Sequence, residues 1–220
     1  MEIIAKIHTD FPEKFGIPRQ SGLALGTVGV IEFVDKYRDV SAVRGLEGYS
    51  HIWLLWQFSE NLNSNWSPTV RPPRLGGNKR MGVFATRSPF RPNPIGLSCV
   101  KLIKVDIKCK NAPVLYVEGA DILDGTPIYD IKPYLPHTDC VSDATGGFST
   151  DVLDNNLNVV IPDCISFDKK AQLCEILSQD PRPSYHNDER LYTMSFAQSE
   201  IFFYVKDKTL YVTKIEPWKK

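Results

Sequence analysis

The sequence has no apolar run long enough to cross a lipid bilayer. No uninterrupted apolar run exceeds the one at Ile52–Trp56, whereas a transmembrane helix needs about 20 apolar residues. Residues 1–6 lack the basic segment and the long apolar stretch of a secretory signal. The five cysteines are odd in number and contain no CxxC pair, which predicts reduced thiols and excludes a disulfide framework or a zinc knuckle. We therefore expect a cytoplasmic protein that does not associate with membranes.

The sequence also lacks the common motifs of nucleotide, metal and hydrolase sites. There is no GxGxxG loop at the start of a helix and no Walker A sequence, so neither a Rossmann cofactor site nor a P-loop is expected. The four histidines show no HExxH or other metal-binding spacing, and no metal is expected. Tyr49–His51 is not the GxSxG elbow of a serine hydrolase.

Acidic residues are absent from residues 61–105, although the whole chain has 26 acidic and 26 basic residues. The basic residues of that stretch are Arg71, Arg74, Lys79, Arg80, Arg87, Arg91, Lys101 and Lys104. Such segregation favours a surface that faces a polyanion within a neutral protein. A solvated basic loop without a ligand is the alternative.

The same stretch is rich in proline. Proline fixes φ and disfavours helix for the residue before it, so Ser88–Gly96 is expected to form a stiff, extended loop. A stiff loop holds its arginines in place at low entropic cost, which suits a preformed site. An ordinary rigid surface connection is the alternative.

Hydrophobic periodicity predicts a mainly β fold. Alternating or apolar runs predict strands at Val30–Val34, Met81–Thr86, Leu97–Ile107 and Val114–Val117, and a strand or short helix at His51–Phe58. Later in the chain, we expect a helix over Asp168–Gln179 with Asp168 as N-cap, then strands at Ile201–Val205 and Thr209–Ile215. The expected architecture is a compact mixed sheet or β-barrel over residues 1–142, a linker over 143–158 and a small α+β domain over 159–220.

Three carboxylates lie close together in sequence at Asp121, Asp124 and Asp130, near Tyr129 and Tyr134. The sequence Asp-Gly-Thr-Pro, which starts at Asp124, is typical of a tight turn. This cluster can bind a cation, accept a proton or, through Asp124, only cap the turn.

Several segments carry distinctive motifs, namely Arg44–Trp53, Thr69–Asn78, Gly82–Ser98, Asp124–Pro127, Asp130–Tyr134 and Gln179–Tyr185. Together they resemble the TsaA-like (TrmO) family of tRNA threonylcarbamoyladenosine methyltransferases, the last segment resembling the C-terminal domain of that family. The resemblance covers nearly the whole chain. It implies a non-Rossmann β-barrel that binds S-adenosylmethionine (SAM), a smaller C-terminal domain and a homodimer. It also implies methylation of N6 of threonylcarbamoyladenosine, the purine just 3′ of the tRNA anticodon.

The resemblance also implies which residues contact the cofactor. These are Pro18, Arg19, Gln20, Ser59, Glu60, Arg87, Leu97, Asp121, Leu123, Asp124, Gly125 and Thr126. The chain departs from the family at Ser59, where related sequences often have histidine after the phenylalanine. A backbone contact at this position would persist, whereas an imidazole contact would be lost.

Methyl transfer from a sulfonium assigns roles to these residues. Asp124 and neighbouring carbonyls are candidates to surround the sulfur, and Arg87 to bind a carboxylate as a bidentate fork. The acceptor nitrogen must lose a proton, for which Asp130, Tyr129 and Tyr134 are the candidate catalytic residues. The tRNA phosphates are expected on Arg71, Arg74, Lys79, Arg80 and Arg91, which would make binding sensitive to salt. The alternatives are a SAM-dependent methyltransferase with another acceptor, and a SAM- or RNA-binding module without activity, which Ser59 favours.

Overall fold

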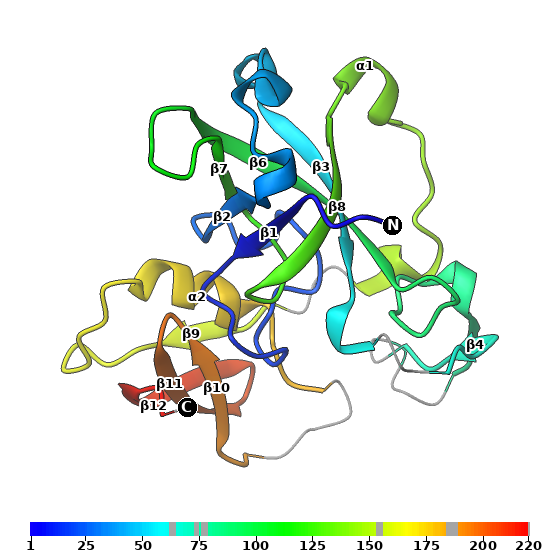
Figure 1. Ribbon diagram of the computed structural model, residues 1–220. Helices are drawn as coiled ribbons and strands as arrows, with labels where there is room; N and C mark the ends of the chain where they lie inside the picture. Colours follow the sequence, from blue (N-terminus) through cyan, green and yellow to red (C-terminus); the bar gives the residue numbers. More distant parts are fainter. Residues whose placement is uncertain (62–64, 73–74, 76–78, 153–155, 184–188, 220) are drawn as a thin grey trace.

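A closed barrel of six antiparallel strands forms the N-terminal part of the chain (Figure 1). The computed structural model describes residues 1–61, 65–72, 75, 79–152, 156–183 and 189–219. In order around the barrel, the strands are β1 (Ala5–His8), β2 (Val28–Phe33), β7 (Val114–Glu118), β6 (Ile95–Asp106), β3 (His51–Gln57) and β8 (Thr126–Pro133). The prediction of a mainly β, non-Rossmann barrel is confirmed.

Strand β3 shows why the barrel forms. Ile52, Leu54 and Trp56 are buried in the barrel core, while the residues between them are only partly buried. This alternation has the period of a strand, because successive side chains point to opposite faces of a sheet. The apolar run at His51–Phe58 is therefore a strand and not a short helix. The strands expected near β2, β6 and β7 are also confirmed, whereas β1 and β8 were not predicted.

The strand expected at Met81–Thr86 is wrong beyond its first two residues. Strand β5 (Met81–Gly82) pairs only with β4 (Thr69–Val70), and a 3-10 helix follows at Val83–Ala85. The Thr86 hydroxyl donates to the Val83 carbonyl at 2.8 Å and closes this turn. Tertiary burial of Val83, which is 1% exposed, thus outweighs the local β propensity.

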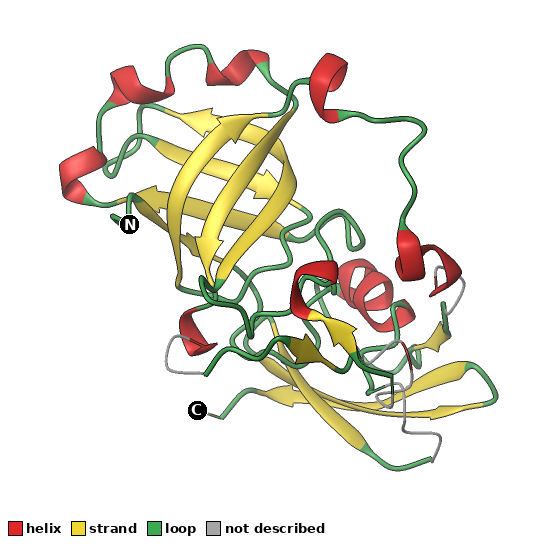
Figure 2. Cartoon of the chain, turned by 90° about the vertical axis from the view of Figure 1, so that its right-hand side faces the viewer, coloured by secondary structure: helices red, strands yellow, loops and turns green. Residues whose placement is uncertain are grey.

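The C-terminal part is a four-stranded sheet covered by one helix, which is the small α+β unit expected. Its strands run in the order β10 (Tyr192–Phe196), β11 (Ser199–Lys206), β12 (Thr209–Pro217) and β9 (Asn158–Val160). Helix α2 (Lys170–Ser178) packs Leu173, Ile176 and Leu177 into the core of this unit. A short helix, α1 (Pro136–Asp139), leads out of the barrel towards this unit (Figure 2).

Helix α2 begins later than expected. Its N-cap position is Lys169, and no side chain caps it. The assignment of Asp168 as N-cap is therefore wrong, because the backbone turn from Phe167 to Lys170 places Asp168 before the first helical turn.

A segment between β1 and β2 contributes to the C-terminal core. Phe11 and Ala24 are both 1% exposed and belong to the hydrophobic cluster of the C-terminal sheet and α2. Phe15 and Ile17 pack against the same cluster. The expected boundaries at residues 142 and 158 stay a prediction, and the second core draws on residues from both sides of them.

The described part of the chain has neither a membrane-spanning helix nor a cluster of metal-binding side chains. Among the described residues, no helix combines the length and apolar character that a membrane crossing requires. Over the same ranges, no three His, Cys, Asp or Glu side chains are grouped so that they could hold a metal ion.

Candidate functional site

A cavity of about 800 Å³ lies at one end of the barrel. It is lined from four parts of the chain, within residues 14–20, 56–61, 86–97 and 121–126. The C-terminal end of β3 meets the N-terminal ends of β6 and β8 here, because β3 runs antiparallel to both. Segments that are far apart in the sequence therefore form a single site.

A buried polar chain forms one wall. The Ser98 hydroxyl donates to Asp121 Oδ1 at 2.5 Å and accepts the Trp56 indole N–H at 2.9 Å. Ser98 is 1% exposed, and burial raises the pKa of Asp121 above its ordinary value. The Ser98 bond and the nearby Arg87 charge act in the opposite direction. Asp121 is thus a partly buried carboxylate on the cavity wall that is stabilised by a fixed donor.

Trp56 takes its place in the cavity wall because its partner across the strands is a glycine. Trp56 pairs with Gly96, and a Cβ at Gly96 would lie 2.2 Å from Trp56 Cε2. Any larger residue would force the indole away from the position in which it donates to Ser98.

The proline-rich loop supplies the opposite wall. Arg91 Nη1 donates to the carbonyls of Thr86 and Ser88, at 3.0 and 3.3 Å. Arg91 therefore stabilises its own loop through these two bonds. Because it lines the cavity, it also places a positive charge there. Arg87 Nη1 donates to Gln20 Oε1, and Gln20 Nε2 donates to the Arg19 carbonyl. These contacts join the loop to the segment at Pro18–Gln20.

An ion pair borders the cavity on the side of residues 58–61. Lys14 Nζ lies 2.9 Å from Glu60 Oε2 and donates to Asn61 Oδ1 at 3.3 Å. Both partners of the ion pair are about half exposed, so solvent screens this interaction.

Comparison with known proteins identifies the family. The profile of the tRNA-methyltransferase O N-terminal domain matches residues 6–140, and that of the TrmO C-terminal domain matches residues 161–218. The chain belongs to the tRNA-methyltransferase O family. A tRNA (adenine(37)-N6)-methyltransferase of Escherichia coli (strain K12) is 40% identical over 229 residues, covering 98% of this chain and 97% of that protein.

A relative and a solved structure from Pseudomonas aeruginosa support the same family. A putative S-adenosylmethionine-dependent methyltransferase, RcsF, is 42% identical over 84% of this chain and 83% of its own length. A crystal structure of TrmO from this species superposes with a TM-score of 0.77 and 31% identity, over 98% of this chain and 95% of that one. The expected membership of the TrmO family is confirmed.

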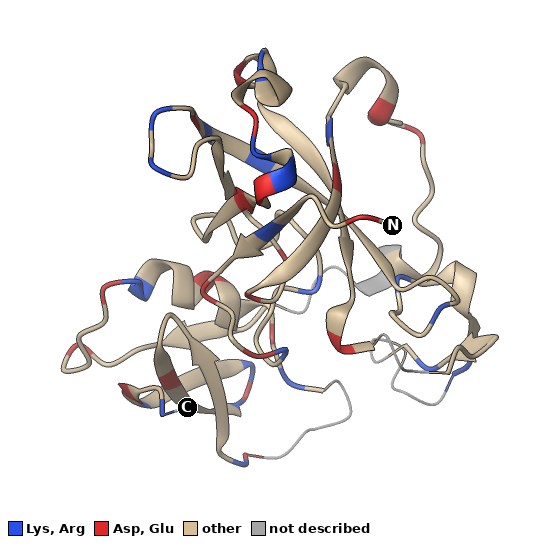
Figure 3. Cartoon of the chain, in the orientation of Figure 1, with Lys and Arg blue, Asp and Glu red and all other residues tan. Residues whose placement is uncertain are grey.

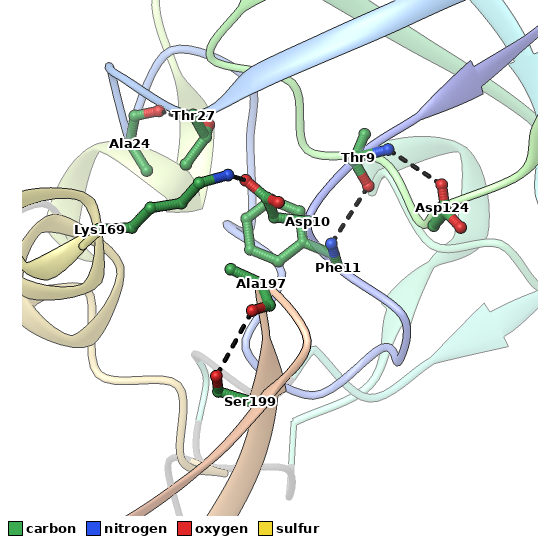
Figure 4. Close-up of polar contacts among 9 residues, drawn as sticks. All are labelled: Thr9, Asp10, Phe11, Ala24, Thr27, Asp124, Lys169, Ala197 and Ser199. Carbon is green, nitrogen blue, oxygen red and sulfur yellow. Dashed lines mark hydrogen bonds and ion pairs between the residues drawn. The ribbon is translucent and has the colours of Figure 1, made fainter. Parts of the chain in front are cut away.

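The structure gathers most of the residues expected to contact the cofactor. The cavity is lined by Pro18, Arg19, Gln20, Ser59, Glu60, Arg87, Leu97, Asp121, Leu123 and Thr126. Asp124 and Gly125 are not among the lining residues. Instead, Asp124 Oδ1 accepts the Thr9 backbone N–H at 3.0 Å (Figure 4). The same oxygen lies 3.3 Å from His8 Nδ1. Asp124 therefore ties the turn to the end of β1, and Gly125 provides the φ of +75° that the turn needs.

None of the three candidate catalytic residues lines the cavity formed by the described residues. Tyr129 is the extra residue of a bulge in β8, and burial raises the pKa of its hydroxyl. Asp130 pairs with Lys132 at 3.0 Å on the outer side of the barrel. Tyr134 packs 5.8 Å from Trp53, near the start of β3, whereas the cavity lies at the end of β3.

The candidate phosphate contacts fall into two places. Arg71, Lys79 and Arg80 are exposed around the β4–β5 hairpin, where Arg80 Nη1 donates to Thr69 Oγ1 at 3.0 Å. In Figure 3, several Lys and Arg residues, drawn in blue, lie in this region at the lower right of the molecule. Arg91 lines the cavity instead, and Arg74 lies outside the described residues.

Sequence reasoning missed Ser98. The signal was present, because the strand alternation that buries Val100 also turns Ser98 into the barrel. A polar residue at an inward position of an apolar strand needs a hydrogen-bond partner, and here Asp121 and Trp56 provide it.

Proposed function

We propose that this chain transfers a methyl group from SAM to N6 of the adenosine at position 37 of tRNA, with threonylcarbamoyladenosine as the acceptor. The cavity at the barrel end carries the proposal, because it brings together ten of the twelve residues that the family resemblance assigns to the cofactor. Its volume of about 800 Å³ falls in the usual range for sites of small ligands and cofactors. The E. coli relative, which matches almost end to end, is named as a methyltransferase of N6 of adenine 37 in tRNA.

The charges in the cavity fit SAM, which carries an anionic carboxylate and cationic amino and sulfonium groups. The Arg87 guanidinium, oriented by Gln20, would bind the carboxylate. Asp121, oriented by Ser98, would face a cationic group. The role near the sulfur that was first considered for Asp124 passes to Asp121, because only Asp121 lines the cavity.

SAM supplies an electrophilic methyl group whose transfer disperses the positive charge of the sulfur. The protein positions the acceptor and stabilises the changing charge, and preformed dipoles do this at little cost in reorganisation. The acceptor N6 must also lose its proton. Asp130, Tyr129 and Tyr134 remain the candidate bases. In the homodimer that the family implies, these residues of one subunit would have to face the cavity of the other.

The acceptor would reach the cavity from the basic side of the molecule. Arg71, Lys79 and Arg80 would hold tRNA phosphates beside the proline-rich loop. A base in the anticodon loop is unpaired, so it needs only to be splayed out and not flipped from a duplex. The cytoplasm, where tRNA is modified, is the proposed location.

Calorimetric titration of SAM into wild type and Arg87→Ala tests the cofactor site. We expect micromolar binding by wild type and a loss of at least about tenfold in the variant, because the carboxylate loses its charged partner. Arg80→Ala is the matched control, since it removes an arginine outside the cavity and should leave SAM affinity unchanged. No binding by wild type, or equal losses in both variants, would contradict the assigned site.

Mass spectrometry of tRNA nucleosides after incubation with SAM then tests the reaction. We expect a mass gain of one methyl group on threonylcarbamoyladenosine. Methylation of another nucleoside would contradict threonylcarbamoyladenosine as the acceptor. SAM binding without turnover would favour a binding module.

A further inference from the structure

The C-terminal unit contacts residues 10–20, the segment that leads from β1 to the cavity. Asp10 forms an ion pair with Lys169 of the C-terminal unit (Figure 4). The Asp10 carbonyl also accepts the Ala197 backbone N–H at 2.9 Å. The next residue, Phe11, packs its ring 5.5 Å from that of Phe196. The segment is therefore anchored at the point where it leaves the barrel.

Further along this segment, Phe15 and Gly16 also contact the C-terminal sheet. The Phe15 ring stacks 6.4 Å from the Phe203 ring, with only 5° between their planes. At Gly16, φ is +96°, and a Cβ would lie 2.8 Å from Met194 Cε. The positive φ favours glycine at this position, and a side chain there would also have to displace the Met194 methyl group of the C-terminal sheet.

The last contact lies directly at the cavity. Arg19 Nη2 donates to the carbonyls of Asp180 and Arg182, each at 3.0 Å. Those carbonyls are held in place by the turn itself, because the Arg182 guanidinium binds the Asp180 carboxylate through two bonds of 2.8 and 2.9 Å. Asp180 has a φ of +49°, so a tight turn presents both carbonyls to one guanidinium.

We propose that the Asp180–Arg182 turn is a positioning element of the cofactor cavity. The turn fixes Arg19, the Arg19 carbonyl accepts from Gln20, and Gln20 in turn accepts from Arg87. Cofactor affinity is thereby coupled to the C-terminal unit, which contributes through Arg19 and not by touching the cofactor itself. This inference rests on the proposed binding of SAM in the cavity.

A purely structural link between the two units would also use these contacts. The two roles differ in how substitutions combine. If Arg182 acts on the cavity through Arg19, removing Arg182 has no further effect once Arg19 is gone. If Arg182 only stabilises the fold, its effect on SAM binding is the same in both backgrounds.

A double-mutant cycle in the full chain tests this, with SAM affinity measured by calorimetry for wild type, Arg19→Ala, Arg182→Ala and the double variant. We expect Arg182→Ala to weaken SAM binding by about fivefold or more in the wild-type background. In the Arg19→Ala background its effect should be less than about twofold. Lys206→Ala is the matched control, because it removes an ion pair with Glu189 elsewhere in the C-terminal unit. It should leave SAM affinity unchanged.

A second variant guards against misfolding of Arg182→Ala. Asp180→Asn keeps a residue type that tolerates positive φ but removes the charge that orients Arg182. It should weaken SAM binding in the same direction, with a smaller effect.

Equal effects of Arg182→Ala in the two backgrounds, or unchanged affinity in both turn variants, would overturn the positioning role. Failure of wild type to bind SAM would instead contradict the proposed function, so the two failures are distinct.

Discussion

Replacing Ser98 by alanine should destabilise the protein in a way that depends on pH. The hydroxyl donates to the Asp121 carboxylate and accepts the Trp56 indole N–H. Alanine removes both bonds without adding bulk. The variant therefore leaves a partly buried carboxylate with one donor fewer and an indole N–H without its partner.

The size of the effect follows from these two losses. A hydrogen bond to an ionised group contributes about 1.5–3 kcal/mol, and an unsatisfied buried donor costs about 1–3 kcal/mol. Since both arise from one deleted atom and partly overlap, we expect a loss of about 3 kcal/mol in the free energy of unfolding at pH 7. With Asp121 protonated, only the neutral bonds are lost, and the penalty should fall to about 1 kcal/mol.

The direction of the pH dependence follows from the pKa of Asp121. Burial raises this pKa in the folded state above the ordinary value of 3.8. The folded protein therefore binds more protons, and its stability falls as pH rises through the folded pKa. Loss of the Ser98 donor raises the folded pKa further, so the variant continues to lose stability over a wider range of pH. The difference between the two proteins should be smallest below 3.8 and reach its full size near neutral pH.

Urea unfolding followed by circular dichroism, from about pH 3.5 to pH 8, measures this difference. Asp121→Asn is the control background, because it retains an acceptor for Ser98 but cannot ionise. There, Ser98→Ala should cost the same at every pH. A constant penalty across the pH range in the wild-type background would refute an ionised Asp121 held by Ser98.

Two further variants test contacts elsewhere in the fold. Gly16→Ala should lower the free energy of unfolding by about 1–3 kcal/mol in urea titrations, since the new methyl group meets Met194 at a φ of +96°; Gly22→Ala, which has open space at a φ of +78°, should cost less, and equal costs would argue against the close packing. Glu118→Gln should cost at most about 1 kcal/mol at pH 7, because Lys101, its hydrogen-bond donor, is half exposed and screened by solvent. That bond lowers the pKa of Glu118 below 4.5, so the wild-type advantage is present above 4.5 and disappears as pH falls through the folded pKa; an advantage that grew in acid would contradict it.

Local sequence signals predicted much of this protein. Apolar patterns predicted the strands near β2, β6 and β7, and the family motifs indicated the enzyme family. The absence of acidic residues from 61–105 also predicted a basic surface, and Arg71 and Arg80 are exposed as that prediction requires. These features are readable because periodicity, charge and motif identity are properties of neighbouring residues.

Only the tertiary structure decided how the site is assembled. Asp121 and Asp124 lie three positions apart and look alike in sequence, yet one faces the cavity and the other binds the Thr9 backbone. Ser98 gained its role only when β6 paired beside β3 and brought it against Trp56.

Likewise, the packing of Phe11 in the C-terminal core has no local signal, because the ring against which it packs belongs to Phe196, near the other end of the chain. Closure of the barrel by β1 and β8, and packing of the C-terminal unit on the segment between β1 and β2, bring together residues that no sequence period connects.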